Sequence, residues 1–186
     1  TELTANRLRL LKEINPRIER VAFPHSDASL GDASADKSVV IGKETATQLG
    51  IILTLLPVKT ADENATVAAS ITAKNVEGII VGGDSLVWSG ISAYINQAIQ
   101  EKIPLAAFDT SQITKGALVG IGPDYRVLGT QAAAITSRIL RGTLPSAIAV
   151  QVPEKLILAV NTATAAKIGL ILPPDLLKRA DLLIRQ

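Results

Sequence analysis

The sequence predicts an α/β fold of three layers, α/β/α, built on a mostly parallel sheet. Its 186 residues are enough for one domain with a hydrophobic core, and 47% of them are apolar while only 3% are aromatic. An apolar composition of Ala, Ile, Leu and Val is typical of a parallel sheet buried between helices. Strand-like and helix-like segments also alternate, at roughly 25–30 residues per unit, which favours right-handed βαβ crossovers.

The clearest βαβ unit covers residues 76–111. Residues 78–81 and 105–108 are predicted as short apolar strands, with a helix over 86–102 between them. Each strand is followed by small polar residues, at 82–85 after the first and 109–111 after the second. Because consecutive parallel strands present their carboxyl ends at one edge of a sheet, where such sheets bind ligands, we expect these polar residues to lie close together.

The chain before this unit is expected to alternate in the same way. Asn15-Pro16 should end the first helix, because the residue before proline disfavours the helical region. Asp36 should cap the second helix and Gly50 should stop it. The expected elements are a helix over 1–20, a strand over 21–23, a loop over 24–35, a helix over 37–49, a strand over 51–56 and a helix from Asp62 or Asn64 to about Lys74.

The alternation changes after Ser111. Gly142 should close a helix there, and an irregular connection should follow it over 143–153. The expected elements are a strand over 117–121, a helix over 124–140, a strand over 156–160, and closing helices over 162–168 and 174–183.

Several kinds of chemistry are excluded by residues that the sequence lacks. There is no Cys, so thiol catalysis and Cys-ligated metal are excluded, and His25 alone cannot build a zinc site. No phosphate-binding loop motif occurs, and residues 120–124 lack the third Gly of a dinucleotide fingerprint. The balance of 19 basic and 17 acidic residues argues against nucleic acid. No apolar run reaches the about 18 residues of a membrane span. We expect no cofactor, no metal and no catalytic residue.

Three loops after predicted strands collect polar side chains that suit ligand binding. Hydroxyls and backbone N–H groups at helix starts suit a carboxylate, and a fixed Asp suits an ammonium or a sugar hydroxyl. A small zwitterion or polyol fits this set. The candidate residues are His25, Ser26 and Ser29 in the first loop, Asp84 and Ser85 in the second, and Asp109 and Thr110 in the third.

Each candidate also has a purely structural interpretation. Asp84 and Ser85 are equally explained as a cap of the next helix, whereas Asp109 favours a ligand because no regular helix plainly follows it. His25 is more often a loop residue with a satisfied ring. Trp88 and Tyr125 are expected to pack rather than bind.

A run of short motifs occupies the last third of the chain, and two more occur earlier. The motifs are Arg7 to Ile14 followed by Pro16, Asp109-Thr110-Ser111, Gly122-Pro123-Asp124-Tyr125, Leu128-Gly129, Ile139-Leu140-Arg141-Gly142, Pro145, Gln151 to Lys155, Val160-Asn161, Ala165 to Leu170, Pro173-Pro174 and Leu177 to Asp181. In their order and spacing they resemble the ABC transporter substrate-binding proteins related to the tryptophan/tyrosine uptake component. The resemblance covers essentially all of the chain.

The resemblance implies a two-lobed protein of the type I periplasmic-binding-protein kind, with the solute held between the lobes by strand-end loops. Carried onto this chain, those loops are the ones around His25, Ser26 and Ser29, the Asp84-Ser85 pair and Asp109-Thr110. The family's usual Pro-Thr-Asp-Asn-like strand end reads Gly-Gly-Asp-Ser here, at 82–85, so the resemblance does not fix the ligand.

The same resemblance implies that this chain corresponds mainly to the second lobe, and the absence of Met suggests a processed or partial chain. We expect one α/β domain over 1–186, with a core lobe over about 1–110 and a hinge or return segment with a closing strand and helices over about 111–186. The apolar residues after Ser111 should either extend the sheet to a flavodoxin-like domain of roughly five or six strands, or remain exposed and promote a homodimer.

The expected function is therefore that of the solute-binding component of an ABC-type uptake transporter, periplasmic or otherwise extracytoplasmic. It would recognise a small polar ligand, an amino acid or similar, and deliver it to a permease. Two alternatives remain: a sensory or effector module that uses the same fold without transport, and an enzyme of flavodoxin-like architecture that uses Asp84 and Asp109.

Overall fold

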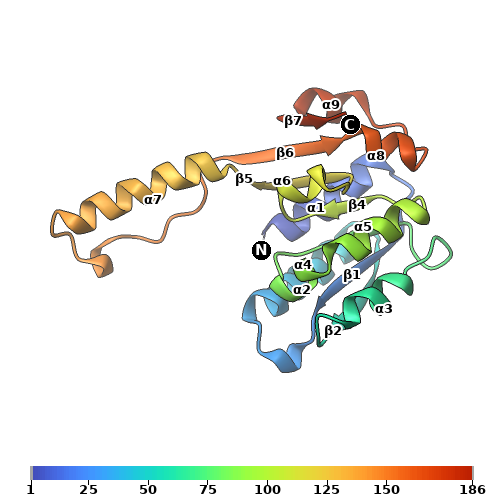
Figure 1. Cartoon of the computed structure of the whole chain (residues 1–186), viewed down its shortest axis with the longest axis horizontal. Coiled ribbons are helices and arrows are strands. Elements are labelled where there is room, and N and C mark those ends of the chain that lie inside the picture. The colour runs from blue at the N-terminus through green and yellow to red at the C-terminus, as the bar shows by residue number, and fades with distance from the viewer. Residues whose placement is uncertain (1, 186) are drawn as a thin grey trace.

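The computed structural model describes residues 2–185 and shows a seven-stranded sheet with helices on both faces (Figure 1). Thr1 and Gln186, which the predicted ranges include, lie outside the described residues. The strands are β1 (Arg20–Ser26), β2 (Ile52–Val58), β3 (Gly78–Ile80), β4 (Leu105–Ala107), β5 (Val119–Pro123), β6 (Leu156–Asn161) and β7 (Leu182–Ile184).

The helices are mostly short, and α7 and α8 begin within two residues of the end of a strand. The α-helices are α1 (Glu2–Ile14), α2 (Ala33–Gln48), α3 (Glu63–Ala69), α4 (Ser85–Ser89), α5 (Ile91–Gln100), α6 (Thr110–Thr114), α7 (Tyr125–Leu140), α8 (Thr162–Lys167) and α9 (Pro174–Arg179), and the 3-10 helices are η1 (Ala28–Leu30) and η2 (Pro145–Ala147). None of the helices in the described part of the chain is both long and apolar enough to cross a membrane.

The strand order is β2-β1-β3-β4-β5-β6-β7. Strands β1 to β5 pair in parallel in the flavodoxin-like order, whereas β6 runs antiparallel to β5 and β7 pairs in parallel with β6. The predicted mostly parallel α/β/α fold is thus confirmed. The order reverses between β1 and β3, and open sheets of this kind bind ligands at such a switch point.

The core consists of two apolar clusters, one on each face of the sheet. Residues of α1, α2, α8 and α9 form the first cluster, and residues of α3, α4 and α5 form much of the second. Strand β4 shows how the faces divide, because Ala106 belongs to the first cluster while Leu105 and Ala107 belong to the second. Strands buried on both faces explain why the sequence is rich in Ala, Ile, Leu and Val.

The first predicted strand was too short and the loop after it too long. Strand β1 continues through Pro24 to Ser26, because β2 pairs along all of it while β3 pairs only at Val21 and Ala22. Proline therefore costs no hydrogen bond to β3 at its position. The loop then contains η1, and α2 is capped by Asp32, whose side chain accepts hydrogen bonds from the backbone of residues 34 and 35. The predicted cap Asp36 lies inside this helix.

Three predicted helices were also wrong in extent. The helix expected to reach about Lys74 ends at Ala69. The helix expected over 86–102 is broken at Gly90 into α4 and α5, where a Cβ on residue 90 would come within 2.3 Å of the Asn64 side chain. Only glycine allows that approach. The helix expected over 174–183 ends at Arg179, and β7 follows it. This additional strand raises the sheet to seven strands instead of the expected five or six.

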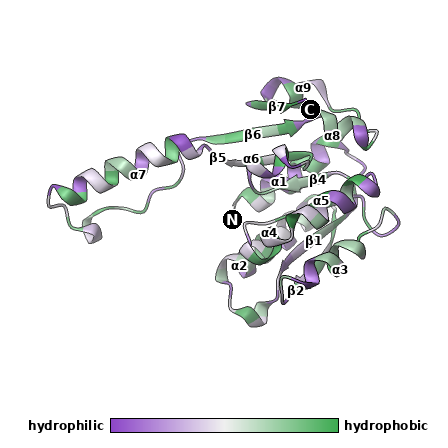
Figure 2. Cartoon of the chain, in the orientation of Figure 1, coloured by the Kyte–Doolittle hydropathy of each residue, from purple (hydrophilic) through white to green (hydrophobic). Residues whose placement is uncertain are grey.

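Helix α7 and the segment 141–155 that returns from it, here called the arm, project away from the rest of the molecule (Figure 1). Gln131 joins the two parts of the arm, because its amide bonds to the backbone of Val152 and Glu154. Apolar residues are interspersed along it (Figure 2). Leu140 is 82% exposed and Val150 is 98% exposed. Both predicted outcomes for the chain after Ser111 thus occur, sheet extension in β5 to β7 and apolar exposure in the arm.

Candidate functional site

The carboxyl ends of β1, β3 and β4, with the loops that follow them, are here called the strand-end edge. Ser26 is the last residue of β1, Asp84 caps α4 after β3, and Asp109 caps α6 after β4. The three predicted loops therefore follow neighbouring strands, as the parallel arrangement requires.

Ser26 and Asp84 bond to each other across the switch point. The Asp84 carboxylate accepts hydrogen bonds from the hydroxyl of Ser26, at 2.7 Å, and from its backbone N–H. It also accepts from the N–H groups of Leu86 and Val87 at the start of α4, at 2.9 and 3.1 Å. Both residues are buried. The Asp84 side chain thus fixes the end of β1 to the start of α4.

Asp109 occupies a similar position after β4. Its carboxylate accepts from the Ser111 N–H at 2.8 Å and from the Tyr125 hydroxyl at 2.6 Å. The expectation that no regular helix follows Asp109 is wrong, because α6 starts at Thr110 and Gln112 completes a capping box with Asp109. Tyr125, which was expected to pack rather than bind a ligand, donates its hydroxyl hydrogen bond to this carboxylate.

These bonds shift both pKa values. Burial alone would raise the pKa of Asp109, but hydrogen bonds from Ser111 and Tyr125 lower it below the ordinary value for Asp. The hydrogen bond to Asp109, helped by burial, raises the pKa of Tyr125 to about 12. Asp109 is therefore a fixed negative charge at neutral pH.

The remaining predicted residues lie around these two carboxylates. Ser85 is exposed at the start of α4, Thr110 is half-buried at the start of α6, and Ser29 is exposed in η1 with its N–H bonded to Asp27. His25 is half-buried, and its Nδ1 lies 2.7 Å from the Ser26 carbonyl oxygen. A carbonyl only accepts, so Nδ1 carries the hydrogen and Nε2 is an acceptor when the ring is neutral.

The strand-end edge also holds unsatisfied polar groups. One is on the predicted residue His25, and two are on Arg7 and Gln112, which the sequence analysis did not propose as site residues. Among the described residues, the buried side-chain nitrogens and oxygens without a hydrogen-bond partner are Arg7 Nε, His25 Nε2 and Gln112 Nε2. His25 lies at the end of β1. Gln112 binds the backbone N–H groups of Phe108 and Asp109 through Oε1, and Arg7 stacks on the Phe108 ring. All three therefore lie at or directly beneath the same edge.

The sequence does carry signals for two of them. A Gln three residues after Asp109 is the capping-box spacing. Arg7 lies at helical spacing from Thr4 and Leu11, among the buried positions of α1, where a charged residue is unexpected.

Aromatic side chains border the edge as well. Trp88 and Phe108 are half-buried, and their ring centroids lie 6.2 Å apart. Gly83 lets the loop after β3 lie flat against Phe108, since a Cβ on residue 83 would come within 2.7 Å of that ring. The edge thus offers flat apolar surfaces beside its polar groups.

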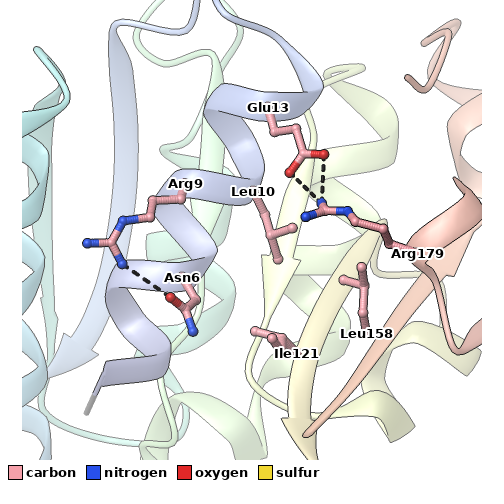
Figure 3. A pocket seen from close by; sticks show the side chains of 7 residues that line it. All are labelled: Asn6, Arg9, Leu10, Glu13, Ile121, Leu158 and Arg179. Atoms are coloured by element: carbon pink, nitrogen blue, oxygen red, sulfur yellow. Dashed lines mark hydrogen bonds and ion pairs between the residues drawn. The ribbon is translucent and has the colours of Figure 1, made fainter. Parts of the chain in front are cut away.

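A separate groove of about 320 Å³ lies elsewhere, between α1 and the β5–β6 pair (Figure 3). Its polar residues are already paired: Arg179 binds both carboxylate oxygens of Glu13 at 2.7 Å, and Arg9 donates to Asn6 at 3.2 Å. The unsatisfied groups therefore single out the strand-end edge rather than this groove as the candidate site. Within residues 2–185, no group of three or more His, Cys, Asp or Glu side chains is placed to hold a metal ion.

The fold agrees with what known proteins show. A family model described as ABC transporter substrate binding protein matches residues 1–184. The chain belongs to the ABC transporter substrate-binding protein family. The predicted resemblance is thereby confirmed.

Solved structures of similar fold include the following three bacterial proteins. A conserved domain protein from Vibrio cholerae is 28% identical with a TM-score of 0.88, over 97% of this chain and 60% of that one. The ABC domain of a Streptococcus pneumoniae protein in complex with L-Trp is 22% identical with a TM-score of 0.87, over 98% and 60%. The substrate-binding protein CD0873 of Clostridium difficile, in a ligand-free, open structure, is 23% identical with a TM-score of 0.73, over 96% and 59%.

The last two likenesses show the fold alone. The family member described here spans 60% of the length of the first two solved structures.

Proposed function

We propose that this chain recognises a small polar solute, an amino acid or a similar compound, at the strand-end edge as part of an ABC-type uptake system. The observation that carries the proposal is the position of the three unsatisfied buried groups, Arg7 Nε, His25 Nε2 and Gln112 Nε2, at this edge. A buried polar group without a partner costs about 1–3 kcal/mol, so a ligand that supplies the missing partners is favoured there.

The arrangement around these groups supports a zwitterionic solute. Asp109 supplies a fixed negative charge for an ammonium, and Ser85 and Thr110 present hydroxyls at the starts of α4 and α6. Trp88 and Phe108 offer apolar surface for a side chain. The L-Trp held by the Streptococcus pneumoniae protein makes L-tryptophan the first compound to test, although that likeness is one of fold.

Family membership supports the setting of this activity. We infer a place outside the cytoplasmic membrane and delivery to a permease, without catalysis. The arm would be covered by a second lobe or by a second copy of the chain, because exposed apolar patches usually mark an interaction surface. The proposed division is a core lobe over about 1–110 and a return segment over about 111–186.

A thermal-shift panel of L-amino acids, sugars and purines tests the proposal. A ligand at about 100 times its dissociation constant stabilises a protein by about 2.7 kcal/mol, which raises the unfolding midpoint measurably. We expect amino acids to raise the unfolding midpoint of the wild-type chain. They should raise it equally in the control Thr136→Val, an exposed site on the arm, and less in Thr110→Val. If no compound class shifts the midpoint, the solute-binding proposal is wrong.

A further inference from the structure

Arg7 is a buried charge near the amino end of α1. It is 1% exposed, and its neighbours on the same face of the helix, Thr4 and Leu11, are buried too. Helix α1 lies against β3, β4 and β5, so Arg7 is enclosed between this helix and the sheet. Arginine is almost never fully buried unless it is paired.

No carboxylate of residues 3–185, the part of the chain whose side chains the structure describes, pairs with Arg7. The ion pairs there join Arg20 to Glu77, Lys155 to Asp124, Lys178 to Asp175 and Arg179 to Glu13. Burial without such a partner lowers the pKa of Arg7 to about 9. An uncompensated buried charge is strongly destabilising, so a partner anion would offset a large cost.

The surroundings of the guanidinium leave one of its hydrogen-bond donors without an acceptor. Its Cζ lies 5.2 Å from the centroid of the Phe108 ring, which covers the flat face of the group. Nη1 donates to the Thr4 hydroxyl at 3.3 Å, while Nε has no partner. The in-plane N–H groups of arginine match the two oxygens of a carboxylate. The single N–H at Nε of Arg7 has no acceptor in the structure.

The position of Phe108 connects Arg7 to the strand-end edge. Phe108 directly precedes Asp109, and its half-buried ring lies next to Arg7, Trp88 and the loop at Gly83. A hydrocarbon ring is held by packing alone, so it can move aside without breaking a hydrogen bond. Arg7 thus lies one side chain below the proposed solute.

We propose that Arg7 is the receptor for an anionic group of the solute, the carboxylate if the solute is an amino acid, and that Phe108 moves to admit it. This inference rests on the proposed function and makes it more specific. It assigns the solute to carboxylate-bearing compounds and separates the carboxylate, at Arg7, from the ammonium, at Asp109.

Isothermal titration calorimetry on the 186-residue chain tests this inference with matched ligands. Each L-amino acid that shifts the unfolding midpoint is compared with its own carboxamide, which keeps the side chain and the ammonium but lacks the negative charge. The variants are Arg7→Met, which removes the charge, Arg7→Lys, which keeps it without the planar fork, and Arg9→Met as a control on the same helix, where the arginine is exposed.

We expect the carboxamide to bind the wild-type chain roughly 10- to 100-fold more weakly than the amino acid, the loss expected for charge-assisted hydrogen bonds. Arg7→Met should lose affinity for the amino acid by a similar factor but bind the carboxamide as wild type does. Arg7→Lys should lie between these, and Arg9→Met should match wild type. The ligand-free Arg7→Met chain should be at least as stable as wild type.

Other results would overturn the inference in distinguishable ways. Equal affinity for amino acid and carboxamide, in wild type and Arg7→Met, would remove Arg7 from recognition and leave solute binding intact. A ligand-free Arg7→Met chain that is much less stable, with unchanged ligand preference, would show that Arg7 stabilises the fold and does not recognise the solute. If no solute of any class binds, both the solute-binding proposal and the role of Arg7 are wrong.

Discussion

The strand-end edge and the arm differ in the kind of group that their surroundings leave without a partner. At the edge, Asp84 and Ser26 are buried and bonded to each other, and polar groups without partners are enclosed there. On the arm, the excess is apolar, because Leu140, Leu144 and Val150 face solvent. Each region therefore leaves one kind of group without a partner, polar groups at the edge and apolar side chains on the arm.

The largest expected difference between the two regions is in the cost of removing a leucine. Leu11→Ala, in α1 against the sheet, should lower the free energy of unfolding by about 2–5 kcal/mol, because it leaves a cavity in the first core cluster. Leu140→Ala on the arm should change it by less than about 0.5 kcal/mol. Urea unfolding of both variants measures the difference. Equal losses would mean that the arm is covered in solution.

The next comparison uses two aspartates with the same capping role. Asp84→Asn should cost about 1–3 kcal/mol, since a carboxylate that accepts four hydrogen bonds is replaced by an amide in a buried site. Asp124→Asn, at the cap of α7, should cost less than about 1 kcal/mol because asparagine also caps helices well and this site is less buried. Thermal unfolding of the two variants checks the order, and a larger loss at Asp124 would contradict it.

The bond from Tyr125 to Asp109 joins the two regions, and its expected effect is smaller and depends on pH. The pKa of Asp109 is lowered in the folded chain, so the folded state binds fewer protons than the unfolded state near that pKa. Its contribution to stability is therefore present above the unfolded pKa of about 3.9 and is lost as pH falls through the folded value.

Tyr125→Phe should remove part of that contribution, about 1 kcal/mol at pH 7. Unfolding followed from pH 7 down to about pH 3 should show that the variant loses less stability on acidification than wild type does. Parallel curves for the two proteins would mean that this bond does not shift the Asp109 titration. Thr130→Val, on an exposed turn of α7, serves as the control.

The smallest expected effect on stability comes from the arm surface itself. Leu144→Ser combined with Val150→Ser should leave the free energy of unfolding within about 0.5 kcal/mol of wild type. It should, however, reduce concentration-dependent self-association measured by light scattering, because these side chains are exposed apolar surface. A wild-type chain that stays monomeric at all concentrations would contradict association through the arm.

The fold class followed from patterns that are local in the sequence. Alternating apolar segments predicted the parallel strands, and Asn15-Pro16 correctly placed the end of α1. Strand β7 was missed because three residues that begin only two residues after a helix carry no periodicity of their own. The break at Gly90 was missed because its cause is Asn64, a residue distant in sequence.

The candidate site was predictable to the level of loops but not of contacts. The strand-end rule placed Ser26, Asp84 and Asp109 at one edge. The hydrogen bonds of Asp84 to Ser26 and of Asp109 to Tyr125 depend on how separate segments are positioned along one another in the folded chain. No single segment of the sequence specifies that position. Arg7 was missed because its meaning comes from the absence of a carboxylate around it, a property of the packed structure.

The way in which the arm is attached has a mechanical consequence. The chain leaves the sheet at Pro123 and re-enters it at Leu156, which are direct partners in the β5–β6 ladder, and the Asp124 N–H bonds to the Lys155 carbonyl at 2.9 Å. The arm is thus a cantilever held by two neighbouring strands. A torque applied to its far end reaches the sheet through that ladder and through the Tyr125–Asp109 hydrogen bond, and a short turn joining the two strands would remove the arm without cutting the sheet.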